Sequence, residues 1–243
     1  MLDRVDSTNE AVRRYRRAGA SDGTVVLAHE QTAGKGRMGR AWSSEPGLGL
    51  YASVLVRPQA PPERVTRWTL GAAVAAAEAC AALGCRKVRI KWPNDLLVDG
   101  RKLAGCLAEY RTLDPEPPEL ILGTGFNVHH EAGDFPPELA TAATSLRQAL
   151  QGNEPNREDL AAAYLERLSG VLAALSAGDW ESIVERWQRQ ALAPVGGRVQ
   201  VRRANGTGYD AVTCGLDDAG ALIVEQEDGT RVHLTLGESV RFE

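Results

Sequence analysis

The chain of 243 residues is long enough for one large domain, or for a large and a small one, with a substantial buried core. Hydrophobic residues make up 43% of it and charged residues 25%, which is typical of a folded globular protein and excludes extensive disorder. Its 28 basic side chains are outnumbered by 32 acidic ones, so a net charge of −4 lacks the broad positive field of a dedicated nucleic-acid-binding protein.

The sequence shows no export signal, membrane segment or metal-binding cluster. The N-terminus is charged where a signal peptide needs an apolar centre, and the longest apolar run, residues 70–83, is mostly alanine and contains Glu78. The four cysteines form no C-x-x-C pair, and none has a histidine partner at metal-ligand spacing. We therefore predict a cytoplasmic protein that binds neither nucleic acid nor a membrane, with its cysteines as small buried side chains.

Hydrophobic periodicity and turn residues predict that helices and strands alternate in the first part of the chain. Ser7 followed by Glu10 is typical of a capping box at the start of a helix. Asp99 and Gly100 are typical of a two-residue hairpin turn, because both tolerate positive φ angles. The predicted elements are a helix over residues 7–19, strands over 24–31 and 48–58, a helix over 62–83, a strand over 87–92, a hairpin over 96–110 and a strand over 119–128.

The second part begins with a predicted surface loop, residues 128–143, and changes in composition near residue 193. Short strand-like runs separated by turns after that point are expected of a small β-barrel. The predicted elements here are helices over residues 156–176 and 179–191 and strands over 198–203, 209–216, 221–226, 231–236 and 239–242. We therefore predict an α+β chain with a large unit, residues 1–192, and a small C-terminal unit, residues 193–243.

Residues 34–40, GKGRMGR, match the G-x-G-x-x-G spacing of a dinucleotide-binding turn, but a strand and not a helix follows them. No helix N-terminus is then available for a pyrophosphate, and the kinase signatures that accompany a glycine loop between strands are absent. Glycines still let backbone N–H groups approach an anion, and Lys35, Arg37 and Arg40 supply cations. The segment is either an anion-binding loop or a solvated, flexible one.

A second group of polar residues lies in KWPNDLLVDGRKLAG, residues 91–105. Lys91 at a strand end and Lys102 across the hairpin could place two ammonium groups near one phosphate or carboxylate, and Asp95 is a candidate ligand for Mg²⁺. The alternative is a polar turn with exposed lysines. Together with the glycine loop, this group favours phosphoryl or nucleotidyl transfer, in which negative charge is gathered and redistributed.

Five motifs follow one another along the chain: DSTN at 6–9, EQTAGKGRMGRAW at 30–42, KWPNDLLVDGRKLAG at 91–105, GTGFNV at 123–128 and ATSL at 143–146. Taken in this order, they resemble the motifs of the biotin protein ligases. The resemblance runs from about residue 3 to the C-terminus, and five ordered motifs are far more specific than any one of them. It implies a mixed β-sheet catalytic domain flanked by helices, like that of class II aminoacyl-tRNA synthetases, followed by a small SH3-like β-barrel.

The resemblance implies an ATP-dependent biotin–[biotin carboxyl carrier protein] ligase that works in two steps. The carboxylate of biotin attacks the α-phosphate of ATP, which gives biotinyl-5′-AMP and pyrophosphate, and a specific lysine of a carrier domain then takes the biotinyl group. The implied ligands are biotin, ATP and Mg²⁺, and the implied partner is the biotin carboxyl carrier protein domain of acetyl-CoA carboxylase or a related carboxylase. Members of the family commonly dimerise, so a homodimer is a further expectation.

The resemblance also implies roles for individual residues. Lys102 and Arg37 are the expected catalytic residues, with Lys102 near the biotin carboxylate and the α-phosphate. The expected biotin-binding residues are Ser7, Thr8, Asn9, Gln31, Gly34, Lys35, Gly36, Arg37, Lys102 and Gly105. The expected ATP-binding residues are Arg37, Arg40, Trp42 as a stacking partner of adenine, Lys91, Asn94, Asp95, Asn127 and Arg241.

Two features depart from the family pattern. Lys35 stands where many members have arginine, which replaces a planar two-pronged contact by a point charge. The chain begins within a few residues of DSTN, so we do not expect the DNA-binding domain or the repressor role of bifunctional members. The nearest alternative function is that of a lipoate or octanoate ligase of the same superfamily, which the K-W-P-N-D and glycine-loop motifs disfavour. A second alternative is a catalytically silent biotin-binding protein, which the presence of Lys102 and Arg37 disfavours.

Overall fold

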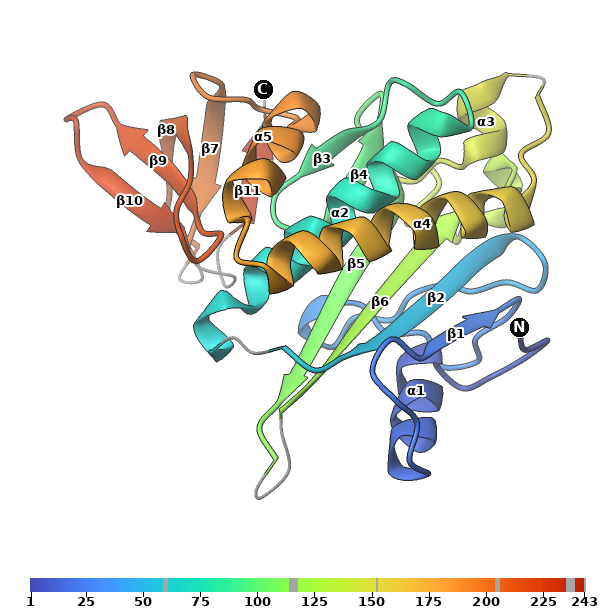
Figure 1. Cartoon of the computed structure of the whole chain (residues 1–243). Helices are drawn as coiled ribbons and strands as arrows, with labels where there is room; N and C mark the ends of the chain where they lie inside the picture. The colour runs from blue at the N-terminus through green and yellow to red at the C-terminus, as the bar shows by residue number, and fades with distance from the viewer. Residues whose placement is uncertain (59–60, 114–117, 152, 204–205, 235–238, 243) are drawn as a thin grey trace.

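Antiparallel β-sheets and a layer of long helices make up the structure, a computed structural model that describes residues 1–58, 61–113, 118–151, 153–203, 206–234 and 239–242 (Figure 1). The helices are α1 (Thr8–Arg17), α2 (Val65–Ala82), α3 (Leu146–Leu150), α4 (Arg157–Ser176) and α5 (Trp180–Gln190), with 3₁₀ turns η1 (Arg37–Gly39), η2 (Pro62–Arg64) and η3 (Ala132–Asp134). The strands are β1 (Val25–Ala28), β2 (Gly49–Val56), β3 (Arg89–Lys91), β4 (Asp95–Val98), β5 (Arg101–Arg111), β6 (Glu119–Asn127), β7 (Arg198–Arg202), β8 (Gly208–Leu216), β9 (Leu222–Gln226), β10 (Arg231–Leu234) and β11 (Ser239–Phe242). The larger sheet has the order β1-β2-β6-β5-β4-β3 and the smaller one the order β10-β9-β8-β7-β11.

One face of the larger sheet is covered by α2 and α4, which lie across it in Figure 1. The alanines of α2 between residues 72 and 79 are fully buried, and such small side chains let the helix pack closely. Gly71 continues this close approach, because an added Cβ there would lie 2.6 Å from Cγ1 of Val171 in α4. Cys106 of β5 and Leu122 of β6 also belong to this core, so the side chains on alternate positions of these strands face the long helices.

The opposite face of the larger sheet is covered in part by α1. The helix packs over the end of the sheet formed by β1, β2 and β6, where Val12, Val26, Leu55 and Ile121 form a small second hydrophobic cluster. This cluster does not include residues of β5, β4 or β3 in the part of the chain that the structure describes. The sheet therefore leaves room on this face for a ligand site beside α1.

The turn between β8 and β9 joins the C-terminal strands to both the larger sheet and the helical layer. Trp92 Nε1 donates to the carbonyl oxygen of Gly220 at 3.0 Å, and Trp180 Nε1 donates to that of Asp217 at 3.1 Å. The predicted α+β class with a small C-terminal β unit is confirmed. Closure of the smaller sheet into a barrel stays a prediction, and residues 235–236 of the predicted fourth strand lie outside the described residues.

Most predicted elements are present. The segment predicted as a surface loop, residues 128–143, is largely exposed between residues 131 and 142, but two of its aromatic side chains are buried. His130 and Phe135 are buried and stack with ring centroids 4.8 Å apart. Leu146–Leu150 forms α3, a helix that no pattern had indicated because five residues are too few to show helical periodicity. Across the described residues, no helix combines the length and the apolar character needed to cross a bilayer.

Candidate functional site

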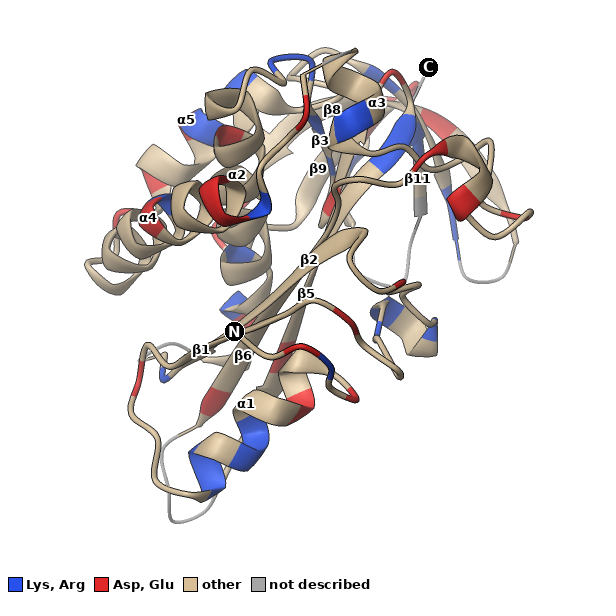
Figure 2. Cartoon of the chain, turned by 90° about the vertical axis from the view of Figure 1, so that its right-hand side faces the viewer, with Lys and Arg blue, Asp and Glu red and all other residues tan. Residues whose placement is uncertain are grey.

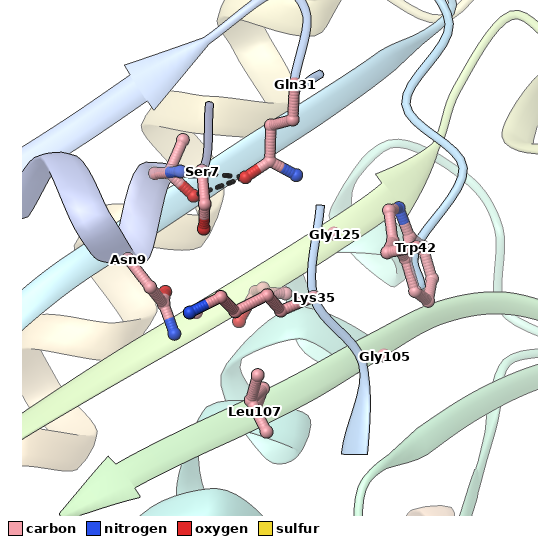
Figure 3. A pocket seen from close by; sticks show the side chains of 11 residues that line it. Ser7, Asn9, Gln31, Lys35, Trp42, Gly105, Leu107 and Gly125 are labelled. Carbon is pink, nitrogen blue, oxygen red and sulfur yellow. Dashed lines mark hydrogen bonds between the residues drawn. The ribbon is translucent and has the colours of Figure 1, made fainter. Parts of the chain in front are cut away.

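A polar pocket lies on the face of the larger sheet that α1 covers in part (Figure 3). Its wall comes from the first turn of α1 and from the loop that follows β1, and its floor comes from β5 and β6. The lining residues are Ser7, Thr8, Asn9, Gln31, Lys35, Trp42, Gly105, Leu107, Gly123, Thr124 and Gly125. The pocket thus brings together motifs that are far apart in the sequence.

Glycines on the floor of the pocket let other side chains approach the strand backbone closely. The strand register places Gly105 of β5 beside Gly125 of β6. An added Cβ would lie 3.0 Å from the indole of Trp42 at Gly105 and 2.7 Å from it at Gly125. An added Cβ at Gly123 would collide with the side-chain amide of Asn9. These positions therefore require glycine because other side chains approach the strand backbone closely.

Hydrogen bonds join the polar side chains of the pocket wall. Thr8 donates its backbone N–H and its hydroxyl to Gln31 Oε1, at 2.8 and 3.0 Å. Gln31 Nε2 donates in turn to Ser44 Oγ at 3.1 Å. Ser53 Oγ of β2 lies 2.7 Å from Thr8 Oγ1 and 2.5 Å from Asn9 Oδ1. The residues predicted to receive the head group of biotin therefore meet in one place.

The capping box predicted at the start of α1 is wrong. Ser7 is the N-cap residue, but its side chain makes no capping hydrogen bond. Glu10 Oε1 instead lies 2.5 Å from both Arg13 Nη1 and Lys35 Nζ. A carboxylate binds two cations more strongly than it binds a neutral backbone N–H, so the ion pairs prevail over the cap. The side chain of Ser7 is left to line the pocket.

The glycine loop, residues 34–40, is closed by its own backbone hydrogen bonds. Trp42 N donates to the carbonyl oxygen of Gly34 at 2.9 Å, and Gly36 N donates to that of Arg40 at 2.7 Å. An added Cβ at Gly34 would lie 2.5 Å from the carbonyl oxygen of Trp42, so this position requires glycine. The structure shows a loop with defined backbone hydrogen bonds at the edge of the pocket, and the binding of an anion by this loop stays a prediction.

Lys102 lies where the pocket meets a group of cations. Its Nζ is 2.7 Å from Asp95 Oδ1 and 5.2 Å from the centroid of the Trp42 ring. Its backbone is held from both sides, because Lys102 N donates to the Ala142 carbonyl oxygen at 2.7 Å and Lys102 O accepts from Thr144 N at 2.9 Å. The segment that contains ATSL thus fixes the position from which the Lys102 side chain extends.

The cations beside the pocket are close enough to influence one another. Burial lowers the pKa of Lys91, and Asp95 opposes this shift. The positive charges of Lys102 and Arg241 lower the pKa of Lys91 further. An anion bound among such cations would relieve their mutual repulsion. We call these residues the cation group: Arg37, Arg40, Lys91, Lys102 and Arg241.

Arg37 and Asn94 join the glycine loop to the start of β4. Arg37 Nη1 donates to Asn94 Oδ1 at 2.7 Å, and Asn94 Nδ2 donates to the Cys106 carbonyl oxygen at 2.9 Å. Burial lowers the pKa of Arg37, Asp95 opposes the shift, and Arg40 adds to it. The two sequence motifs that suggested anion chemistry are therefore in contact.

Asn127 and Trp42, both predicted to bind the nucleotide, contact other parts of the protein in the structure. Asn127 Nδ2 donates to the carbonyl oxygens of Lys102 and Thr144, at 3.3 and 3.0 Å, so it supports the Lys102 backbone. Trp42 lies on the pocket floor, among the residues predicted to bind biotin. Its Nε1 is buried and makes no hydrogen bond with the described residues.

A complete metal site is not present among the described residues, because no group of three or more His, Cys, Asp or Glu side chains there could hold a metal ion. Asp95, the predicted Mg²⁺ ligand, pairs with Lys102. Magnesium binding therefore stays a prediction.

Several pocket residues were not assigned from the sequence. Leu107 lies two residues after Gly105 on β5, so strand alternation could have indicated it. Ser53, which supports Thr8 and Asn9 from behind the pocket wall, gave no such signal, because every residue of β2 is buried and the strand shows no alternation. Gly123 and Gly125 belong to a recognised motif, but only the strand register shows that they form the floor.

Comparisons with known proteins show which family and which solved structures this chain resembles. Residues 1–127 match the Biotin/lipoate A/B protein ligase family. The bifunctional ligase/repressor BirA of Bacillus spizizenii is 34% identical over 229 residues, which cover 94% of this chain and 70% of that relative. The biotin–[acetyl-CoA-carboxylase] ligase of Paracoccus denitrificans is 31% identical over 237 residues, 96% of either chain. The solved biotin protein ligase of Aquifex aeolicus in complex with biotin and ATP is 27% identical with a TM-score of 0.83, over 100% of this chain and 97% of that one.

Proposed function

The chain belongs to the Biotin/lipoate A/B protein ligase family and is a biotin ligase, and we propose that it forms biotinyl-5′-AMP and transfers biotin to a carrier lysine. The proposed acceptor is a specific lysine of a biotin carboxyl carrier protein domain. The Paracoccus relative is named a biotin–[acetyl-CoA-carboxylase] ligase, which supports a carboxylase as the partner. The hydrogen-bonding side chains of the pocket wall suit the polar head of biotin, and the cation group suits the phosphates of ATP.

The position of Lys102 is the observation that carries this proposal. Its Nζ touches Asp95 on the side of the cation group, and it would lie 3.2 Å from a Cβ added at Gly105 on the pocket floor. An ammonium group at this boundary can contact a carboxylate that leaves the pocket and a phosphate held by the cations. Biotin and ATP must react at just such a boundary.

In the first step, a carboxylate oxygen of biotin attacks the α-phosphorus of ATP, and the bond to pyrophosphate breaks. Two anions must approach each other, so the reaction needs positive charge that is already in place. Lys102 stabilises the charge that develops on the transferred phosphate. Arg37 holds the glycine loop to Asn94 and supplies a second positive charge from the loop.

In the second step, the carrier lysine attacks the acyl carbon of the mixed anhydride, and AMP leaves. The anhydride must be kept from water until then, and the glycine loop at the pocket edge is suited to that role. The large unit, residues 1–192, contains the pocket, whereas the small unit, residues 193–243, contributes Arg241 near Lys91.

Magnesium would enter this site with the nucleotide. Mg²⁺ is commonly held by one or two carboxylates together with substrate phosphates, and Asp95 is a carboxylate that lies among the cations. The donor set therefore fits an ion that arrives bound to ATP, where it would neutralise phosphate charge. Asp95 would then exchange its contact with Lys102 for one with the metal.

Biotin-dependent exchange of pyrophosphate into ATP tests the first step. We expect exchange with biotin and none with lipoate; exchange with lipoate alone would assign the chain to the lipoate branch of the family. A carrier domain and a carrier with its acceptor lysine replaced by arginine then test the second step. Transfer to both carriers, or to neither, would contradict the proposed acceptor.

A further inference from the structure

Arg13 is a buried arginine that none of the roles above uses. Only 2% of its side chain is exposed, although it lies on a polar helix. Its Nη1 is 2.5 Å from Glu10 Oε1, its Nη2 is 3.1 Å from Glu109 Oε2, and its Nε is 3.7 Å from Glu119 Oε1. Figure 2 shows charged residues of α1 beside acidic segments of the adjoining sheet. A buried guanidinium is costly unless carboxylates surround it, so Arg13 determines where these carboxylates lie.

The Glu109 carboxylate orients a side chain of the pocket. Glu109 Oε2 accepts a hydrogen bond from Asn9 Nδ2 at 2.6 Å. The other end of the same amide, Asn9 Oδ1, lies 2.5 Å from Ser53 Oγ. Because a carboxylate only accepts and the NH₂ group only donates, this contact sets which way the amide faces. Asn9 therefore presents one defined orientation to a ligand.

The Glu10 carboxylate holds the glycine loop. Glu10 Oε1 lies 2.5 Å from Arg13 Nη1 and also 2.5 Å from Lys35 Nζ, and Lys35 lines the pocket. The hydrogen bond from Lys35 is the main cause that lowers the pKa of Glu10, with the charge of Arg13 acting in the same direction against burial. Figure 3 shows the side chains of Lys35 and Asn9 pointing toward each other. The loop and the head-group wall thus converge at one end of the pocket.

We propose that Arg13 is a positioning residue of the biotin site. Through Glu109 it fixes the amide of Asn9, and through Glu10 it holds Lys35 and hence the glycine loop at the same end of the pocket. The proposal rests on the proposed function and assigns residues outside the predicted site. The two carboxylates then have separate effects: Glu109 sets the affinity for biotin, and Glu10 sets the retention of biotinyl-5′-AMP.

Variants of Glu109 test the first of these roles. Glu109→Ala removes the acceptor for Asn9 Nδ2, and we expect the KM for biotin to rise about 10-fold, the loss of one charge-assisted hydrogen bond. The KM for ATP and kcat should stay within about twofold. Glu109→Gln keeps an acceptor oxygen, so it should recover a KM for biotin within about threefold of wild type. Biotin binding by calorimetry without ATP gives the same comparison independently of catalysis.

Variants of Glu10 test the second role. Glu10→Gln removes the charge that holds Lys35, so preformed biotinyl-5′-AMP should dissociate about fivefold faster while the KM for biotin changes less than about twofold. Arg17→Gln, at an exposed arginine of the same helix, is the matched control and should change neither quantity. Arg13→Met should show both effects, and the glutamate variants keep the test valid if that variant fails to fold.

Distinct outcomes would overturn each proposal. An unchanged KM for biotin in Glu109→Ala, or an equal rise in the KM for biotin and for ATP, would overturn the positioning role while wild-type activity left the proposed function intact. An unchanged dissociation of biotinyl-5′-AMP in Glu10→Gln would also overturn it. A wild-type protein that neither binds biotin in the calorimeter nor exchanges pyrophosphate would overturn both.

Discussion

At the pocket wall, Thr8, Gln31 and Ser44 satisfy one another through neutral hydrogen bonds, whereas the cation group places like charges close together near a single carboxylate, Asp95. A neutral, hydrogen-bonded wall selects a ligand by the geometry of donors and acceptors. Clustered cations select it by charge and accept many geometries. The two regions therefore differ in what should disturb them: a misplaced atom in the first, and a lost or screened charge in the second.

The largest expected effect comes from removing the charge at the boundary between these regions. Lys102→Ala should lower the rate of biotin-dependent pyrophosphate exchange by about 10²-fold or more, by analogy with the loss of one oxyanion donor. Biotin binding without ATP should weaken far less, because the wall stays intact. Lys87→Ala, at an exposed lysine, is the control. Near-normal exchange in Lys102→Ala would remove this lysine from catalysis.

A single methyl group on the floor should disturb the neutral region alone. In Gly125→Ala the new Cβ would lie 2.7 Å from the Trp42 indole, so we expect the KM for biotin to rise about 10-fold through steric displacement, with the KM for ATP nearly unchanged. Gly133→Ala adds its Cβ to open space and should alter neither constant. Equal increases for both substrates would show that the two regions are not separable.

Raising the salt concentration should weaken the binding of ATP and leave the binding of biotin nearly unchanged, the opposite of the floor substitution. Raising KCl from about 50 to about 500 mM shortens the screening length, so the KM for ATP should rise about threefold as the attraction of the cation group weakens. The dissociation constant for biotin should change less than about 1.5-fold, measured by calorimetry without nucleotide. A comparable salt dependence for both ligands would indicate that charge also governs the wall.

The smallest expected effect comes from a substitution in α4, outside both regions, which should change stability without changing substrate binding. Gly170 is exposed in the middle of α4, and an added Cβ there meets no atom within 4 Å. Gly170→Ala should raise the free energy of unfolding by about 0.5–1 kcal/mol, because alanine loses less backbone entropy in a helix. Denaturant unfolding measures this change, and both KM values should stay at wild type. A change in either KM would mean that α4 influences the site.

Local patterns in the sequence were sufficient for elements and motifs. The hairpin turn is an example: Asp99 and Gly100 have φ angles of 50° and 76°, as two turn residues with positive φ require. α3 could not be predicted in the same way, because a helix of five residues carries too little periodicity. Motifs 34–40 and 91–105 were predicted to serve one reaction, and the contact between Arg37 and Asn94 supports that prediction.

The contacts that organise the wall could not be predicted, because they depend on tertiary structure. Asn9 and Glu109 are 100 residues apart in sequence, and Asn9 and Ser53 are 44 apart. Only the register of β2, β6 and β5 brings these side chains together, and nothing within any one segment encodes that register. Trp42 was predicted from its motif alone to stack on adenine. In the structure its indole packs against Gly105 of β5 and Gly125 of β6 on the pocket floor, a contact that the motif does not indicate.

The glycine floor also limits how this enzyme could be adapted to altered substrates. Gly105, Gly123 and Gly125 have no side chain to trim, so a bulkier analogue of biotin cannot be accommodated by shortening them. Leu107 and Trp42 are apolar lining residues with side chains that can be shortened. Leu107→Ala is the natural starting point for accepting an enlarged ring, because it leaves the contact between Trp42 and Lys102 in place. A pocket whose floor is formed by glycines is therefore easy to narrow by substitution and hard to widen.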